Sequence, residues 1–422
     1  MTSFKKYENH TLSTEIDAGI KEIIEKELER QKSQLILIAS ENFTSQEVIN
    51  TMGSVLTNKY AEGYPGFRYY AGCENVDEAE KLAINRANQL FGSNYSNVQP
   101  HSGVSANLAV FLGILNCGDK ILSMNLRDGG HLSHGHKQNL SGRYYEIHKY
   151  SVDPETEMID YENVRKLAKD IRPKLIIAGA SSYSRVIDFK KFREVADEVG
   201  SYLLADTAHI AGLMVTGYHP SSVNVADFTT ATTHKTLRGP RGGLIIADKK
   251  YAGLIDRSVF PGVQGGPMMH IIAAKAVAFR EALKDSFKDY SRRIIENSKA
   301  LCDYMKNEGF RIVSGGTDNH LFLVDLTSKG LTGYEAVETL TSVGIIINRN
   351  VIPFDKQSPM ITSGIRIGTP AVTTQGMGVQ EMYKIGELIS SALENRKNNT
   401  KLKEIGKKVK NLTGDFPVYT KE

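Results

Sequence analysis

Between residues 75 and 250, short apolar runs alternate with stretches that have the spacing of amphipathic helices. The runs lie at 120–124, 174–178, 201–205 and 243–247, and helical stretches such as 75–91 and 189–199 lie between them. Strands that are apolar on both faces and separated by helices form a parallel sheet that is covered on both sides. The sequence therefore predicts an α/β fold with a mostly parallel sheet.

The pattern changes after residue 268, where a long helical stretch to about residue 306 leads into shorter elements. These are a strand at 320–326, a helix at 333–342 and a strand at 344–348. Before the sheet region, residues 13–30 carry isoleucines at helical spacing, which predicts an amphipathic helix that could pack on a partner subunit. We predict three parts, namely a helical arm (1–30), a large domain (31–285) and a smaller α+β C-terminal domain (286–422).

The composition argues against a nucleic-acid-binding, secreted or membrane protein. The 52 Lys plus Arg nearly balance the 48 Asp plus Glu, so we expect no nucleic-acid partner, and we interpret the basic stretch at 396–410 as a solvated helix face. No signal peptide and no apolar run of ~18 residues is present, which argues against secretion and membrane insertion. Cys73, Cys117 and Cys302 are far apart and form no paired motif, which favours a reducing cytoplasm.

Ligands of parallel sheets bind beyond the carboxyl ends of the strands, and Lys235 follows one predicted strand. It stands in the stretch Thr232-Thr-His234-Lys235, before a glycine-rich bend that carries Arg238 and Arg241. Neighbouring cations and desolvation make a lysine amine nucleophilic toward carbonyl carbon, as pyridoxal phosphate chemistry requires. Thr232 and His234 could bind the phosphate of that cofactor. A surface lysine in a polar loop is the alternative.

Asp206 ends another apolar run, where its carboxylate could pair with a pyridinium nitrogen. His209, three residues later, could reach the phenolic oxygen of the same ring. Ser102 and Gly103 precede an apolar helix, whose free N–H groups form an anion cradle. An aspartate or a serine at such places can also be an ordinary cap. Together with Lys235, however, the three motifs predict a pyridoxal phosphate site.

Three histidines follow the predicted strand at 120–124, in Gly129-Gly-His131-Leu-Ser-His134-Gly-His136. The stretch has no thiolate and Asp128 is its single adjacent carboxylate, so we do not predict a metal site. We expect His131 to stack on an aromatic cofactor, and we interpret His134 and His136 as structural or exposed.

Two further motifs suit an amino-acid substrate. Residues 58–70 combine four tyrosines with Glu62, which is a candidate acid or base, although a purely structural turn is an alternative. Arg366 lies between apolar neighbours in a strand-like run. A guanidinium in that setting needs a carboxylate partner, which is either the α-carboxylate of a substrate or an internal acid.

Together these motifs closely resemble serine hydroxymethyltransferase, over about residues 15–377. They are Thr232-Thr-His-Lys235, Asp206-Thr-Ala-His209, Tyr60-Ala-Glu62-Gly-Tyr64, Gly129-Gly-His131-Leu132, Leu37-Ile-Ala-Ser40, Gly265-Gly266-Pro267 and Ser363-Gly-Ile-Arg366. The resemblance implies a fold-type-I pyridoxal phosphate enzyme with a seven-stranded sheet. It also implies a homodimer or a dimer of dimers with shared active sites. In one-carbon metabolism and amino-acid biosynthesis, such an enzyme interconverts serine plus tetrahydrofolate with glycine plus 5,10-methylenetetrahydrofolate.

The resemblance also implies roles for individual residues. Pyridoxal phosphate would be bound covalently by Lys235 and contacted by Ser102, Gly103, His131, Ser181, Asp206, His209, Thr232 and His234, with Tyr60 and Gly266 from the partner subunit. The substrate would meet Ser40, Glu62, Tyr70, His209 and Arg366. The folate site would include Glu62, Tyr69, Leu126, Gly130, His131, Leu132, Asn350, Ser358, Pro359 and Met360. Lys235, Glu62, His131, Asp206, Tyr70 and His234 would be the catalytic residues.

The chain departs from the family pattern at Val104, where a serine is usual, at Thr207, where methionine is usual, and at Phe67, where lysine is common. Val104 predicts weaker binding of the cofactor phosphate unless Ser105 compensates. Two other functions use the same site, namely a folate-independent β-hydroxy amino acid aldolase or an α-methylserine hydroxymethyltransferase. A non-catalytic binding protein is a further alternative, against which the intact Lys235 argues.

Overall fold

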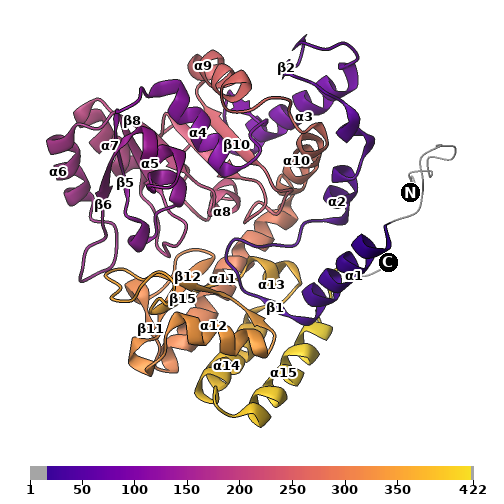
Figure 1. Cartoon of the computed structure of the whole chain (residues 1–422), viewed down its shortest axis with the longest axis vertical. Helices are drawn as coiled ribbons and strands as arrows, with labels where there is room; N and C mark the ends of the chain where they lie inside the picture. Colours follow the sequence, from indigo (N-terminus) through magenta and orange to yellow (C-terminus); the bar gives the residue numbers. More distant parts are fainter. Residues whose placement is uncertain (1–16, 420–422) are drawn as a thin grey trace.

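A seven-stranded sheet forms the centre of the larger part of the computed structural model, which describes residues 17–419 (Figure 1). The strand order is β4-β10-β9-β8-β7-β5-β6, and the five strands from β9 to β6 are parallel. The strands are β4 (Ser96–Asn97), β5 (Lys120–Met124), β6 (Glu146–Tyr150), β7 (Leu175–Gly179), β8 (Tyr202–Asp206), β9 (Phe228–Thr232) and β10 (Gly243–Ala247). The predicted mostly parallel sheet is therefore confirmed, with two of its strands shifted by one residue.

Helices cover both faces of this sheet (Figure 1). They are α2 (Gln46–Met52), α3 (Glu74–Phe91), α4 (Gly103–Ile114), α5 (Leu140–Tyr144), α6 (Tyr161–Ile171), α7 (Phe189–Val199), α8 (Ala211–Val215), α9 (Ala252–Arg257) and α10 (Met269–Ala282). On β7, Ile176 packs in a core with Phe192 of α7, whereas Ile177 packs in a second core with Phe111 of α4. Successive side chains of a strand point to opposite faces, so β7 is buried on both, as its apolar run predicts.

Local signals explain why α7 has the bounds that the sequence predicts. The Asp188 carboxylate caps its first turn by accepting from the backbone N–H groups of Lys190 and Lys191. Gly200 ends the helix in the left-handed region, with φ of 71°. The helix buries Phe189, Phe192, Val195 and Ala196 against the sheet.

The C-terminal part contains a four-stranded antiparallel sheet in the order β11-β12-β15-β14, packed against helices. Its elements are β11 (Arg311–Ile312), β12 (Leu321–Asp325), α12 (Gly333–Ser342), β14 (Asn348–Asn350), β15 (Gly364–Gly368), α13 (Pro370–Thr374), α14 (Val379–Glu394) and α15 (Asn399–Gly414). The strand predicted at 344–348 is wrong as one element. Its two halves pair with different partners, because β13 (Ile345–Ile346) joins β1 (Leu35–Ile36) and β14 joins β15.

Two segments connect the parts. The helical stretch predicted at 268–306 is two helices, α10 and α11 (Asp285–Asn307), and α11 packs Ile294 into the core beside α10 and Leu301 into the C-terminal core. Leu35 and Leu37 also lie in the C-terminal core, because β1 pairs with β13. The packing thus places these leucines with the C-terminal part rather than with the predicted large domain, while the division near residue 286 stays a prediction.

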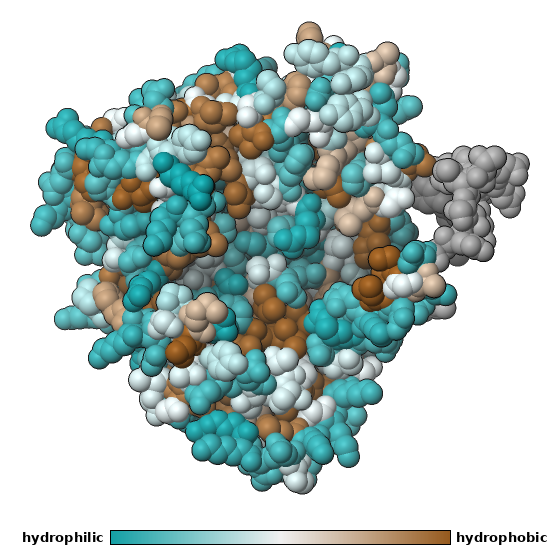
Figure 2. All heavy atoms as spheres, viewed as in Figure 1, coloured by the Kyte–Doolittle hydropathy of each residue, from teal (hydrophilic) through white to brown (hydrophobic). Residues whose placement is uncertain are grey.

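The first described helix, α1 (Ala18–Ser33), supports the predicted amphipathic helix, although residues 13–16 lie outside the described residues. Ile20, Ile23 and Ile24 are 53% to 61% exposed, and Figure 2 shows that apolar and hydrophilic side chains are mixed over the visible face of the molecule. Near the other end, α15 buries Ile405, Val409 and Leu412 and exposes its lysines, which confirms the solvated basic face. Within residues 17–419, no helix is both long enough and apolar enough to cross a membrane.

Candidate active site

A cavity of about 490 Å³ opens at the carboxyl ends of the parallel strands. The predicted residues that line it are Ser40, Ser102, Gly103, Leu126, Gly130, His131, Leu132, Ser181, Asp206, His209, Thr232, His234, Lys235 and Arg366. A larger cavity of about 670 Å³ lies at the amino ends of β8 and β9 and contains none of them. The smaller cavity is therefore the candidate active site.

Lys235 is almost fully buried in this cavity, three residues after the end of β9. The pKa of its amine is lowered to about 8, chiefly by burial; the Asp206 carboxylate opposes this shift, and the charges of Arg366 and Arg241 add to it. A larger fraction of the amine is consequently neutral near pH 7 than in an ordinary lysine, as a nucleophile requires.

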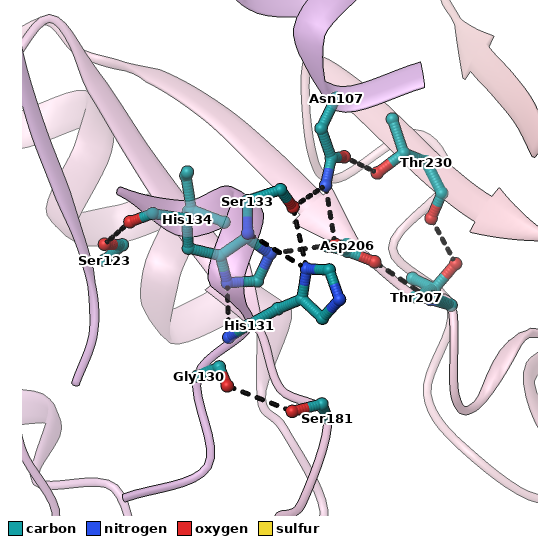
Figure 3. A network of polar contacts seen from close by, with 12 residues as sticks. Asn107, Ser123, Gly130, His131, Ser133, His134, Ser181, Asp206, Thr207 and Thr230 are labelled. Carbon is teal, nitrogen blue, oxygen red and sulfur yellow. Dashed lines mark hydrogen bonds and ion pairs between the residues drawn. The ribbon is translucent and has the colours of Figure 1, made fainter. Parts of the chain in front are cut away.

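Asp206 ends β8, and a hydrogen-bond network keeps its carboxylate ionised (Figure 3). His134 Nε2 and Asn107 Nδ2 each lie 2.8 Å from Asp206 Oδ2. The backbone N–H of His131 donates to His134 Nδ1, so a neutral His134 carries its proton on Nε2 and donates to Asp206. Burial raises the pKa of Asp206, but the hydrogen bonds from His134 and Asn107 help to outweigh burial and hold that pKa well below its usual range.

Sequence reasoning missed two members of this network. The sequence predicts that His134 is structural or exposed; it is in fact buried and contacts Asp206 directly. Asn107, which lies on α4 five residues after the Ser102 cap, has no predicted role. The role of His134 could have been predicted from its position three residues after His131. Residues three apart in a 3-10 turn, here Leu132–His134 with His131 as its cap, lie on the same side. Among the described residues, no group of three or more His, Cys, Asp or Glu is arranged to hold a metal ion.

His131 presents a neutral ring to the cavity. Burial lowers its pKa to about 4, with an opposing effect of the Asp206 charge. Its Nδ1 accepts a hydrogen bond from the Ser133 backbone N–H, at 3.2 Å. A neutral imidazole that lines the cavity suits contact with an aromatic ring, and its stacking stays a prediction.

Arg366 lies on β15 with its guanidinium at the cavity. Its Nη1 donates to the Ser181 carbonyl at 2.6 Å, and its Nε donates to Asn348 Oδ1 at 3.1 Å. Within residues 17–419 its hydrogen bonds go to an amide and a backbone carbonyl and not to an acid, which does not support the alternative of an internal salt bridge. Burial lowers its pKa to about 10, and a guanidinium in this setting still needs an anion. The cavity is thus built to receive a carboxylate beside Lys235.

A family model described as serine hydroxymethyltransferase matches residues 13–389, which is most of the 422-residue chain. The chain belongs to the serine hydroxymethyltransferase family. It is a pyridoxal phosphate-dependent enzyme that interconverts serine plus tetrahydrofolate with glycine plus 5,10-methylenetetrahydrofolate. The match confirms the resemblance, the fold-type-I class and the predicted activity.

The residues of this serine hydroxymethyltransferase fit a phosphorylated pyridine cofactor. Ser102 caps α4, and a Cβ added at Gly103 would lie 2.7 Å from Thr232 Cγ2, so the helix start is packed closely against β9. His234 Nδ1 is buried and lacks a hydrogen-bond partner among the described residues. Arg241 adds a positive charge at the same cavity. These groups suit a phosphate, while Asp206 suits a pyridinium nitrogen.

The structure shows the neighbours of two predicted cofactor residues, His209 and Ser102. His209 is buried, and its Nδ1 lies 3.2 Å from His320 Nε2, a neighbour that sequence reasoning missed. Ser105 Oγ lies 3.1 Å from Ser102 Oγ, so a second hydroxyl stands at the cradle although Val104 replaces the usual serine. Compensation by Ser105 for the serine that Val104 replaces stays a prediction.

Several predicted residues do not line the cavity in the single chain, namely Tyr60, Glu62, Tyr69, Tyr70, Gly266, Asn350, Ser358, Pro359 and Met360. Tyr60 Oη donates to Glu62 Oε1 at 3.3 Å, and the rings of Tyr60 and Tyr70 meet edge to face at 5.1 Å. The loop that carries them, with β2 (Gly63–Tyr64), lies at the upper edge of Figure 1. Arg68 holds this loop in place by pairing with Asp77 and Glu80 on α3.

Proposed function

We propose that this cavity is the active site of the hydroxymethyltransferase and that Lys235 binds pyridoxal phosphate covalently. One observation carries the proposal: a buried lysine, an ionised aspartate and an arginine that has no acidic partner within residues 17–419 surround one cavity. When bound, pyridoxal phosphate supplies an electron sink for the negative charge that develops at the substrate Cα. The side chains around the cavity transfer protons, keep the cofactor ring protonated and orient the substrate.

Each of these side chains has a distinct task. Lys235 Nζ releases and takes up a proton near neutral pH, because its pKa is about 8. Asp206 stays ionised and so holds a proton on a pyridine nitrogen placed against it. Ser40 and Arg366 bind the α-carboxylate of serine, which fixes the orientation of the bond that breaks. His131 covers one face of the cofactor.

Replacing Arg366 with lysine is expected to raise the KM for serine about 30-fold or more, because a point charge cannot replace a bidentate guanidinium. Steady-state kinetics with saturating tetrahydrofolate measure the change. Arg349→Lys on the neighbouring strand β14, where the guanidinium lies over the Tyr334 ring, is the matched control and should leave KM unchanged. An unchanged KM for Arg366→Lys would remove Arg366 from the substrate site.

The Tyr60 cluster, which we define as Tyr60, Glu62, Tyr69, Tyr70 and Gly266, acts in the site of a partner subunit under this proposal. Its aromatic residues are exposed in the single chain, with Tyr69 76% and Tyr60 54% accessible. Exposed aromatic side chains in one area are typical of an interface. A homodimer, or a dimer of dimers, would bring the cluster to the cavity of the other chain, with Glu62 handling protons at the serine hydroxyl and the folate.

Mixed dimers of Glu62→Gln and Lys235→Met chains test this arrangement. In a mixed dimer, one site would combine the intact Lys235 of one chain with the intact Glu62 of its partner. Random mixing should therefore restore about a quarter of the wild-type, tetrahydrofolate-dependent transfer. If Glu62 served its own chain, both sites of every mixed dimer would be defective, and activity would stay at the level of the parent variants.

The folate is proposed to bind at the rim of the cavity, along Leu126, Gly130 and Leu132 and toward the segment 350–360. Leu126 and Leu132 are 41% and 50% exposed there. Arg127 Nη1 donates to the Asp355 carbonyl at 2.9 Å, which holds that segment beside the rim. Asn350, Ser358, Pro359 and Met360 would complete the site.

The three cysteines are free in the structure, which supports a proposed cytoplasmic location.

A further inference from the structure

Lys275 is a buried cation that the reaction described above does not use. It lies on α10 and is 1% exposed. Its Nζ donates to three backbone carbonyls, those of Val98 at 2.6 Å, Gly243 at 2.8 Å and Pro100 at 3.0 Å. All three N–H donors of the ammonium are thus occupied by main-chain oxygens. The acid whose charge acts on it, Glu80, is itself paired with Arg68.

The three carbonyls belong to the two segments that form the phosphate cradle. Residues 98–100 lead directly into Ser102, the cap of α4. Gly243 begins β10, immediately after the glycine-rich bend that follows Lys235. The backbone N–H of Gly243 donates to the Pro100 carbonyl at 2.9 Å, and a Cβ at Gly243 would clash with the Ser102 carbonyl. Lys275 therefore binds both segments at the point where they touch.

A second side chain fixes the first segment from another direction. Gln264 Nε2 donates to the Gln99 carbonyl at 2.8 Å, and its Oε1 accepts from the His101 N–H at 3.2 Å. Between them, Lys275 and Gln264 bind the carbonyls of Val98, Gln99 and Pro100 and the N–H of His101. Without the Lys275 ammonium, buried carbonyls would lose their donor, and the segment would shift to find others.

Packing alone gives no reason for a cation at this place. Burial lowers the pKa of Lys275 to about 7, so the ammonium is costly to bury. The surrounding face of α10 is apolar, with Met269, Ile272, Ala276 and Phe279 in the same core. An apolar side chain of the same length would fill the space at a lower cost, but each of the three carbonyls would lose one hydrogen bond, and only Pro100 is shown to keep another, from the Gly243 N–H.

We propose that Lys275 is a positioning residue for the cofactor phosphate, because it holds the two segments so that the N–H groups at the start of α4 stay aimed at the phosphate. Lys275 itself does not line the cavity. The inference rests on the proposed function, which places the phosphate at Ser102 and Gly103. It concerns a residue that neither the family motifs nor the cavity residues include.

The test compares binding of pyridoxal phosphate and of pyridoxal, which lacks the phosphate, to the cofactor-free protein. Lys275→Met should raise the dissociation constant for pyridoxal phosphate about tenfold or more, and should leave that for pyridoxal within about twofold. Lys275→Gln keeps two N–H donors and should fall between Met and wild type. Should the Met variant fail to fold, the Gln variant provides the comparison.

Asn297→Leu is the matched control, because Asn297 is a buried side chain on α11 that donates to the Met377 carbonyl, away from the cradle. It should lower the melting temperature without changing either dissociation constant. The proposal is overturned if both folded Lys275 variants bind pyridoxal phosphate as wild type does. It is equally overturned if binding of pyridoxal weakens to the same degree, since general loosening would affect both ligands.

Gly103→Ala separates this inference from the proposed function. The added methyl would lie 2.7 Å from Thr232 Cγ2 and so would disturb the cradle itself. If Gly103→Ala leaves binding of pyridoxal phosphate unchanged, the cradle is misplaced and the proposed function fails at that point. If Gly103→Ala weakens binding of pyridoxal phosphate alone while Lys275→Met has no effect, only the role of Lys275 is contradicted.

Discussion

Replacement of Lys235 by methionine is expected to lower tetrahydrofolate-dependent glycine formation by about 1,000-fold or more. Methionine fills the same space, but it can neither attack a carbonyl carbon nor carry a proton. Lys174→Met is the matched control, because Lys174 is an exposed lysine at the opposite end of the sheet, at the start of β7. Activity of Lys235→Met within tenfold of wild type would show that another amine performs the reaction.

The role of Lys235 can also be tested by the pH dependence of cofactor attachment. The folded-state pKa of Lys235 is lowered to about 8, so the neutral amine forms as pH rises through about 8. The rate at which the cofactor-free protein takes up pyridoxal phosphate should therefore rise to about pH 8 and then level off. A rate that keeps rising toward pH ~10.4, the ordinary lysine value, would contradict the buried position of the amine.

Asp206→Asn is expected to lower kcat by about 100-fold to 4,000-fold, because loss of one partner of a buried charge pair costs about 3–5 kcal/mol. The amide keeps the shape of the carboxylate but cannot hold a proton on a pyridine nitrogen. Asp227→Asn is a matched control, since Asp227 pairs with Arg193 at the other end of the same strands. That variant should lose stability without losing kcat. A kcat within threefold of wild type for Asp206→Asn would contradict the assigned contact.

His134→Leu should produce a weaker form of the same defect. Loss of the Nε2 donor raises the pKa of Asp206, because that hydrogen bond is the largest contribution opposing burial. A carboxylate with a raised pKa is protonated at a higher pH, so the acid limb of the kcat profile should move to higher pH. An unmoved acid limb would mean that His134 does not control Asp206.

Much of the cofactor side of the site could be predicted from the sequence, because local patterns determine it. The runs at 201–205 and 243–247 are apolar on both faces, which requires a covered sheet, and the chemistry of such a sheet lies at its carboxyl edge. Asp206 and Lys235 follow neighbouring strands, so parallel pairing of β8 with β9 brings their ends together. The end of β8 and the loop after β9 were therefore sufficient to predict that Asp206 and Lys235 lie close together.

The remaining features depend on contacts between distant segments. Nothing in the stretch around Leu35 indicates that it pairs with Ile345, and this pairing moves residues 35–37 into the C-terminal core. The contact of His134 with Asp206 joins residues 72 positions apart, and it depends on how the turn after β5 folds back over β8. The loop of Glu62 lies away from Lys235 in the single chain, and sequence patterns do not say which chain a loop serves.

We propose that Lys235 carries the cofactor at the carboxyl edge of the sheet. Borohydride reduction of the pyridoxal phosphate-loaded enzyme, followed by proteolysis and mass spectrometry, locates the lysine that bears the cofactor. We predict a phosphopyridoxyl group on the peptide that contains Thr232, Thr233, His234 and Lys235, with its mass attached to Lys235. A group found on Lys149, Lys275 or another lysine, or no labelled peptide at all, would contradict the account.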